Sequence, residues 1–536
     1  MKHINRAALC ATDSLGRRFE PSEATPQKRD RKVGIFYFMC HVDTAFESGG
    51  AEYFEDVLDS YDVESLGTPD SPFYDYDYGI PFYWGKPLFG CYRNNDEWVL
   101  RRHVEMLTLA DVDFIVIDST NNNSWVDDTL RLMKILDEGL KEGVETPKVA
   151  FYTNTDSGKR IRQIYDGIYA KGLYPETWFM LENNPVILGN AYDTEPELIE
   201  LFHFKDAQWP NDSIKESAFP WIDFGEQRVY ASPDGSESVM SVSVAQNSDP
   251  DTACFSQNYL RGTNGSHGRS YHNGDANITE DSYKYGYNFS EQWENAREKD
   301  PDIVFITGWN EWTAGVWNMG ENNPVGIFDC LNPEYSRDIE PMEGGFGDAY
   351  YQLLIDEVRK YKGIEIENTA LPIRYDNFTT ASVQRNTATP KGDFKDNSLR
   401  NVITACEVSA DGDELVFSAE TSADIDCGDR IGDWMRLYVD PEKPDAFCYC
   451  FNMRTVGDGK TVAAKRENGR WIRIGLIDHT VEGNRITLRV PRKLIGDTDK
   501  LYFKWVDSRV PCHNGDDFYL YGSVAPLGRL YFKVNI

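Results

Sequence analysis

The chain has 536 residues, too many for one hydrophobic core, so two or three domains are expected. Its 55 Lys and Arg stand against 88 Asp and Glu, and the net charge of −33 argues against nucleic acid, anionic lipid or a strongly acidic polysaccharide as a partner. No apolar run of about 18 residues and no signal-peptide core occur, which predicts a cytoplasmic protein without membrane association.

Residues 1–31 are polar and poorly patterned, and they predict an N-terminal extension. From residue 32 onward, β-branched runs alternate with amphipathic stretches. They predict strands at 33–39, 112–117, 148–152, 185–188, 201–204, 239–245, 302–306 and 325–330, and helices at 96–110, 126–142, 158–171, 290–299 and 347–361. About eight strands alternating with helices predict an α/β fold, a TIM-like (β/α)8 barrel that spans 32–365.

The pattern changes after the last predicted helix. Residues 366–400 lose periodicity and predict a linker. Short alternating runs separated by turn residues then fill 401–536, at 414–419, 434–439, 447–453, 471–476, 485–490, 501–505 and 530–534. This texture predicts an all-β C-terminal domain, a β-sandwich.

The stretch Trp309-Asn310-Glu311-Trp312 directly follows the predicted strand at 302–306. A carboxylate between two indoles and an amide suits a sugar-cleaving site. The rings stack on pyranose faces, the amide holds a hydroxyl, and apolar walls help the acid to protonate a leaving oxygen. The alternative is that both tryptophans are core aromatics and Glu311 lies on the surface.

Polar residues follow nearly every predicted strand, where the catalytic groups of such barrels lie. They are His41, Asp43, Asp118, Thr120, Asn121, Tyr152, Asn154, Lys205, Gln246, Asn247, Asn310, Glu311 and Asp329. A glycosidase needs two carboxyl groups. Glu311 is the first choice for one; Asp118 leads for the other, followed by Asp329 and then by Asp338 and Glu340. Each residue alone has a structural alternative, such as helix capping by Asp118.

Long loops add candidates for substrate contact. Trp84 in the 83–90 loop offers a ring, Arg269 and His272 in a Gly-rich loop offer donors, and Arg337 can hold a carboxylate or a substrate oxygen. The spacing of His267 and His272 favours sugar contact or a surface position over metal binding. The ten cysteines contain no paired Cys-x-x-Cys motifs, so free thiols and no metal site are expected. Neither Gly-x-Gly-x-x-Gly nor a phosphate loop is present, and no cofactor is expected.

The segment 308–312, together with Arg337-Asp338-Ile339-Glu340-Pro341 and the runs at 34–38, 84–90 and 113–118, resembles glycoside hydrolase families 99 and 71 and their bacterial relatives. The resemblance spans about residues 30–365 and implies a (β/α)8 barrel acting on α-mannosides or α-glucans, with Glu311 as a catalytic residue. The second catalytic glutamate of family 99 corresponds to Ala314 here, so only Glu311 carries over. The runs at 433–440 and 518–522 are similar to family 9-like carbohydrate-binding sandwiches.

Three hypotheses of function follow. The first is a glycoside hydrolase that uses Glu311 as general acid/base with a second carboxylate and takes a carbohydrate substrate. The second is a catalytically inactive carbohydrate-binding protein, which Ala314 supports and the ring of polar strand ends opposes. The third is a glycan-modifying transferase on the same barrel. Nothing in the sequence selects an oligomeric state.

Overall fold

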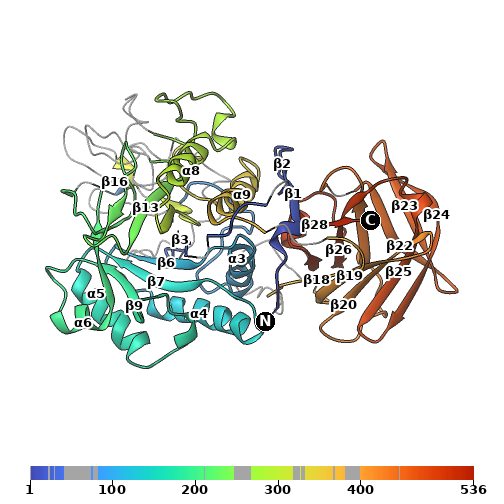
Figure 1. Ribbon diagram of the computed structural model, residues 1–536, viewed down its shortest axis with the longest axis horizontal. Coiled ribbons are helices and arrows are strands. Elements are labelled where there is room, and N and C mark those ends of the chain that lie inside the picture. Colours follow the sequence, from blue (N-terminus) through green and yellow to red (C-terminus); the bar gives the residue numbers. More distant parts are fainter. Residues whose placement is uncertain are drawn as a thin grey trace.

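The structure is a computed structural model that describes residues 2–21, 24–28, 30–41, 65, 74–75, 82–210, 212–246, 267–314, 316–317, 326–327, 332–365, 369–380, 399–445 and 447–536. Figure 1 shows a barrel of strands and helices on the left and an all-β part on the right. The chain passes from the N-terminal strands between the two parts into the barrel and then into the all-β part.

Eight parallel strands form a nearly closed barrel, as the sequence predicts. In order around it they are β3 (Lys32–Tyr37), β6 (Phe114–Ser119), β7 (Lys148–Thr153), β9 (Asn184–Gly189), β10 (His203–Gln208), β11 (Phe219–Pro220), β13 (Ser238–Ser243) and β14 (Ile303–Thr307). Strand β14 pairs with β3, and within the described residues no ladder joins β11 to β13. Every residue of β6 and β14 is buried, as expected for parallel strands covered on both faces.

Helices cover the outside of the barrel (Figure 1). They are α3 (Glu97–Leu109), α4 (Val126–Lys141), α5 (Ser157–Ile164) with its π-helical continuation η3 (Tyr165–Tyr169), α6 (Pro196–Leu201), α8 (Tyr287–Lys299) and α9 (Ala349–Lys362). Single 3-10 turns are η1 (Arg6–Ala8), η4 (Pro175–Thr177), η5 (Ser282–Lys284) and η6 (Arg492–Leu494). None of the helices in the described ranges combines the length and the hydropathy needed to cross a bilayer.

Two strand predictions in the barrel were wrong. The predicted strand at 325–330 contributes only β17 (Gly326–Ile327), which pairs with β16 (Val316–Trp317) beside β4 (Tyr74–Asp75) in a separate small sheet. The eighth barrel strand is instead β11, whose two residues are too short for any periodicity. The strand predicted at 201–204 is displaced to β10, because α6 continues to Leu201.

The C-terminal part is an antiparallel sheet that bends into two layers. Its strands are β18 (Ile373–Asp376), β19 (Ile403–Asp411), β20 (Glu414–Thr421), β21 (Asp433–Asp440), β22 (Tyr449–Gly457), β23 (Lys460–Glu467), β24 (Arg470–Glu482), β25 (Arg485–Pro491), β26 (Lys500–Ser508), β27 (Ser523–Ala525) and β28 (Leu530–Asn535), with the short helix α10 (Asp517–Leu520). The rings of Phe417 and Phe503 lie 5.6 Å apart although β20 and β26 are distant in the strand order. Side chains from the two layers therefore pack against each other, and the domain is a β-sandwich, as predicted.

The N-terminal segment belongs to this sandwich. The sequence predicts a poorly patterned extension over 1–31, but β1 (Leu9–Thr12) pairs with β28, and β2 (Arg18–Phe19) pairs with β1. In Figure 1 both strands lie between α9 and β28. Leu9 and Ala11 are buried, so this short edge strand adds to the apolar core of the sandwich. A strand of four residues is too short to show a periodicity from which it could be predicted.

A buried aspartate joins the barrel to the sandwich. Asp348, which precedes α9, accepts hydrogen bonds from the Ser14 backbone N–H (2.9 Å) and the Tyr519 hydroxyl (2.8 Å), and forms an ion pair with Arg529 (3.3 Å). Its partners come from the N-terminal segment and from the sandwich.

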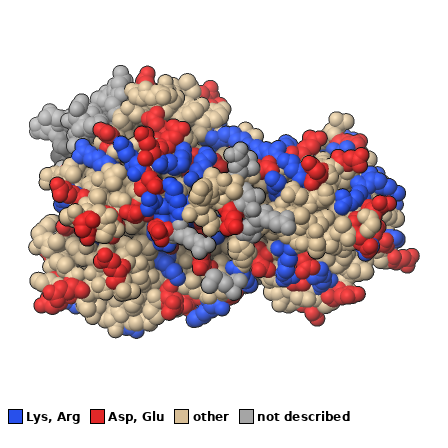
Figure 2. All heavy atoms as spheres, in the orientation of Figure 1, with Lys and Arg blue, Asp and Glu red and all other residues tan. Residues whose placement is uncertain are grey.

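Lys and Arg side chains gather near the junction of the two parts on the face shown in Figure 2, among interspersed acidic groups.

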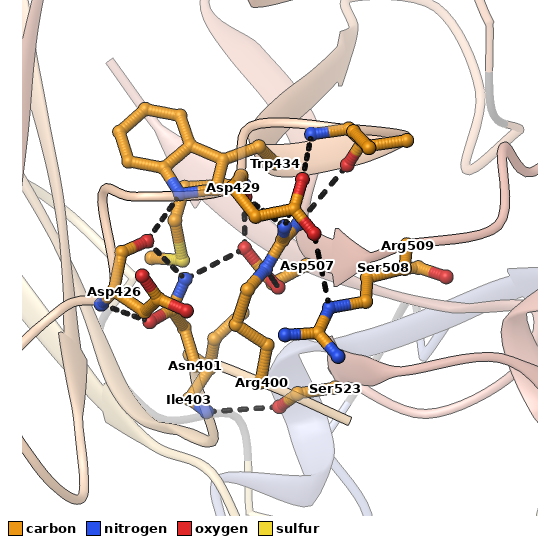
Figure 3. A network of polar contacts seen from close by, with 12 residues as sticks. Arg400, Asn401, Ile403, Asp426, Asp429, Trp434, Asp507, Ser508, Arg509 and Ser523 are labelled. Carbon is orange, nitrogen blue, oxygen red and sulfur yellow. Dashed lines mark hydrogen bonds and ion pairs between the residues drawn. The ribbon is translucent and has the colours of Figure 1, made fainter. Parts of the chain in front are cut away.

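A second buried polar network holds the loop between β20 and β21 onto the sandwich (Figure 3). The Arg400 side chain is 1% exposed and pairs with Asp507 at 2.8 Å, while it also donates to the backbone oxygens of Asp429 and Ile431. The other oxygen of Asp507 accepts from Asn401 at 2.9 Å and from the Met435 backbone at 3.0 Å. Every described partner of the Asp507 carboxylate is a donor, which compensates its burial.

Candidate functional site

Glu311 lies beyond the carboxyl end of β14, on a turn fastened to the neighbouring strand β3. The Trp309 backbone donates to the Phe36 carbonyl at 2.8 Å. The Asn310 side chain accepts from the Phe38 backbone at 2.9 Å and donates to the Phe38 carbonyl at 3.2 Å. The prediction that the Asn310 amide holds a sugar hydroxyl was therefore wrong, because the side chain is buried and replaces a strand partner for β3.

The tryptophans of this region are core residues. Trp309 and Trp312 are 0% exposed, and Trp312 stacks on Trp84 with ring centroids 4.8 Å apart. The Trp84 indole donates to the Glu311 carbonyl at 2.8 Å, and the Trp312 indole donates to Glu340 at 2.5 Å. Sugar stacking by these three rings is contradicted, and the alternative of core aromatics holds. The Trp84 indole, which Trp312 supports by stacking, holds the backbone of Glu311 in place.

The Glu311 side chain itself stays at the edge of solvent. It is 11% exposed, and its carboxylate forms an ion pair with Arg337 at 3.1 Å. The Arg337 guanidinium lies over the Trp221 ring, 4.9 Å from its centroid. The carboxylate thus has a cationic neighbour in addition to the apolar walls that the sequence suggests, and the prediction that Arg337 can hold a carboxylate is met.

Two aspartates accompany Glu311. Asp338 accepts a hydrogen bond from the Glu311 backbone N–H through Oδ1, and it is 0% exposed. Asp118, at the end of β6, is buried but for a small fraction and accepts from the Thr120 backbone (3.0 Å) and hydroxyl (2.7 Å). Asp118 therefore caps its own turn.

The three acids all lie close enough to the thiol of Cys40 to act on it electrostatically. Burial raises the pKa of Cys40, and the negative charges of Glu311, Asp118 and Asp338 raise it further, while a hydrogen bond from Thr313 opposes them. Cys40 follows β3, so the carboxyl ends of β3, β6 and β14 meet here. The sequence pointed to the acids but not to Cys40, which no motif marks.

Burial raises the pKa of Asp338 from its ordinary 3.8 to about 7, against the lowering effect of Arg269. This carboxyl group favours folding fully below about pH 4, and its contribution is lost as the pH rises to 7; the gap corresponds to roughly 4 kcal/mol. We expect Asp338→Asn to abolish this loss, because the amide keeps an acceptor for Glu311 without a titrating proton. In urea unfolding, the stability of the variant minus that of wild type should be about 3 kcal/mol larger at pH 8 than at pH 5, because only wild type loses stability over this range. A difference that does not change with pH would contradict the assignment.

Several predicted contact residues are packed inside. Tyr152 lies in the barrel interior and donates to the carbonyls of Gln208 (3.2 Å) and Phe219 (3.1 Å). Arg269 is buried, donates to Ser336 and to the Asp338 carbonyl, and contacts the rings of Phe346 and Tyr350. The prediction of Arg269 as a donor on a flexible loop was wrong, because its guanidinium anchors the segment that carries Arg337 and Asp338.

His41 is buried beside the site. Burial lowers its pKa to about 3, and electrostatic interactions with His103 and Arg93 lower it further. Its ring tilts against Tyr92 at 4.9 Å, and its backbone N–H donates to Asn94. The ring is therefore buried and neutral, and sugar contact by His41 stays a prediction.

The remaining predicted residues scatter. Lys205 pairs with Glu237 at 3.1 Å before the start of β13, at the amino end of the barrel, so the structure does not bring it to the site. His272 sits on a surface turn, where its ring stacks on Tyr287, and Asn154 bonds Asn190. Gln246 lines a separate cavity, described below. Asp43, Asn247 and Asp329 lie outside the described residues.

Glu340 is a support of the site rather than a member. Its carboxylate accepts from the Tyr92 hydroxyl at 2.7 Å and from the Trp312 indole, and bonds the His103 ring at 2.9 Å. The side chain is fully buried with described partners on both oxygens. A second catalytic acid has to reach the substrate with one carboxyl oxygen, whereas both oxygens of Glu340 bond to buried protein groups.

No protein-family model matches this chain, and no curated protein does. Among solved structures, it is similar to the GH99 endo-α-mannosidase from Bacteroides thetaiotaomicron, with 14% identity, 62% of this chain and 97% of that chain covered, and a TM-score of 0.36 for its complex with BIS-TRIS-propane. A structure titled without a ligand gives the same identity and TM-score and covers 98% of that chain. A glycoside hydrolase-like protein is similar at 11% identity and a TM-score of 0.29, with 63% and 97% covered. At this level the similarity decides nothing about the reaction, which has to be argued from the site.

Proposed function

We propose that the barrel is a glycoside hydrolase in which Glu311 is the general acid/base. One observation carries the proposal. At the carboxyl end of β14, a partly exposed glutamate carboxylate paired with Arg337 shares its surroundings with two aspartates. Cleavage of a glycosidic bond by water needs two carboxyl groups in one site, one that donates a proton and one that acts as base or nucleophile.

The roles divide by exposure. Asp118 is the second carboxylate in this proposal, because its side chain is not fully enclosed and it ends a barrel strand. Asp338 is a positioning residue, because it is fully buried and reaches Glu311 only through the backbone N–H. Asp329 remains the alternative second carboxylate.

The proposed substrate is a neutral glycan. The net charge of −33 repels anionic polysaccharides, and the acids of the site add to that repulsion. The resemblance of the segment 308–312 to families 99 and 71 directs the choice to α-linked mannosides and glucans.

The test is a panel of neutral α-mannan and α-glucan oligosaccharides incubated with the full chain in water and in ¹⁸O-labelled water. New reducing ends carrying the label support hydrolysis, and the anomer released first, seen by NMR, tells retention from inversion. Products that appear only with an added acceptor sugar indicate a transferase. Absence of any cleavage across this panel, with binding present, overturns the proposal.

Ala314 favours a second candidate, a carbohydrate-binding protein without catalysis. The position that resembles the second catalytic glutamate of family 99 carries a methyl group here. In that case the same panel gives binding without products. The sandwich would then be a second binding module on the same chain.

A further inference from the structure

A polar cavity of about 250 Å³ lies outside the acid cluster, against α8. Four of its lining residues, Asn288, Glu291, Gln292 and Asn295, follow a spacing of three, one and three along the helix and therefore share one face. Within the described residues no helix stands between β11 and β13. The segment 224–229 occupies this place, so the polar face of α8 meets a loop instead of a neighbouring helix.

The amides of this face use one end for the fold and turn the other toward the cavity. Gln292 accepts from the Ser243 backbone at 2.6 Å through Oε1, which leaves its NH₂ group out of the described bonds. Asn288 donates to the carbonyls of Ser243 (3.2 Å) and Val244 (3.1 Å), and Asn295 donates to Gln227 (3.0 Å). The side-chain oxygens of both asparagines have no described partner. Donors and acceptors thus line the same small space.

An aromatic ring completes the wall. Tyr271 lines the cavity, and one face of its ring stacks on His267 with centroids 3.6 Å apart. Among the described residues, no other ring stacks on Tyr271, and its side chain contributes an aromatic surface to the cavity wall. Gln246 also lines the cavity. Its side-chain NH₂ group donates to the backbone oxygens of Asp223 and Gly225, and its side-chain oxygen bonds the His267 ring.

We propose that this cavity is a second carbohydrate site that holds one neutral hexose ring. Its volume is just below the roughly 300 Å³ at which pockets for drug-sized ligands begin, which suits a single ring. A hexose presents hydroxyls that both donate and accept, as the amides require, and an apolar face for Tyr271. The carboxylates of Glu226 and Glu291 accept from hydroxyls and repel acidic sugars.

The residues that line the cavity do not include Glu311, and the segment 221–223 connects the two places. Asp223, whose carbonyl accepts from Gln246, is two residues from Trp221, and the Trp221 ring lies under the Arg337 that pairs with Glu311. The proposal concerns binding and not cleavage. It therefore stands or falls independently of hydrolysis by the barrel.

The test is titration of the full chain with methyl α-mannoside, methyl α-glucoside, methyl β-galactoside and methyl glucuronide, followed by saturation-transfer NMR. We expect at least one neutral hexoside to bind and the glucuronide not to bind. Tyr271→Ala and Asn295→Leu should each weaken binding by about tenfold or more, because they remove the ring or the acceptor. Tyr271→Phe, which keeps the ring, should retain it.

The matched control is Glu298→Gln, an exposed position one turn beyond the cavity on the same helix, which should bind as wild type does. Unchanged far-UV circular dichroism and melting temperature show that Tyr271→Ala and Asn295→Leu are folded. Binding of no hexoside at tens of millimolar, binding that both variants leave intact, or equal binding of the glucuronide would each overturn the proposal.

Discussion

Replacement of Glu311 by Gln is expected to lower the rate of glycan hydrolysis by about 10³-fold, with substrate binding retained. The amide keeps the shape of the side chain and can still meet Arg337, but it neither donates a proton to a leaving oxygen nor takes one from water. General acid/base groups of this kind contribute typically about 10²- to 10⁴-fold. The measurement is kcat/KM on the substrate that the panel identifies, with affinity from titration.

The leaving group distinguishes the role of Glu311 from that of Asp118. On a dinitrophenyl glycoside, whose leaving group needs little protonation, Glu311→Gln should recover much of its first-step rate, whereas Asp118→Asn should not. Glu298→Gln makes the same chemical change at the far end of α8, and its activity should equal that of wild type. Full activity of Glu311→Gln, or loss of sugar binding together with turnover, would refute the assignment.

Replacement of Arg400 by Met is expected to destabilise the sandwich by about 3–5 kcal/mol, because it leaves the Asp507 carboxylate buried without its cation. The Arg400 side chain is 1% exposed and that of Asp507 is 0% exposed, so water cannot take the place of the guanidinium (Figure 3). The loop that contains Asp429 and Ile431 also loses its anchor. Urea unfolding of the full chain, followed by far-UV circular dichroism, measures the change.

The double variant Arg400→Met with Asp507→Asn should recover a large part of the lost stability, because no charge stays buried. Arg489→Met is the matched control, since Arg489 forms ion pairs with Asp411 and Glu414 on the exposed side of the same sandwich. It should leave stability unchanged, as surface pairs contribute little. Equal effects at Arg400 and Arg489 would contradict the burial argument.

The long periodic elements of the barrel could be predicted because their pattern is local. Strand β6 begins with four consecutive apolar residues, and α4 carries a regular apolar face, so both were predicted within two residues of their bounds. Strand β11, with two residues, and the edge strands β1 and β2 are too short for a pattern. They exist because a neighbouring strand offers them unpaired backbone groups.

The residues of the candidate site also fall into two groups, those that the sequence pattern identified and those whose burial only the structure shows. Glu311 and Asp118 follow predicted strands, and the rule that strand ends carry function sufficed to name them. Trp309, Asn310 and Arg269 have the residue types of a sugar site, yet they are buried supports. Whether a ring or an amide is buried or exposed depends on the segment that packs against it. Here that segment is 334–340, which is distant in the sequence from Arg269 and from part of the barrel core.

By itself, the sequence determined the α/β barrel, the sandwich and the acidic character of the chain, because hydrophobic periodicity and charge are carried by neighbouring residues. Only the tertiary structure decided which polar residues face solvent and which are buried. It brought Asp338 and Arg337 to Glu311, joined residues 9–19 to the last strand, and left the polar face of α8 beside a loop. These outcomes depend on contacts between segments far apart in the chain, and such contacts leave no periodic trace in the sequence.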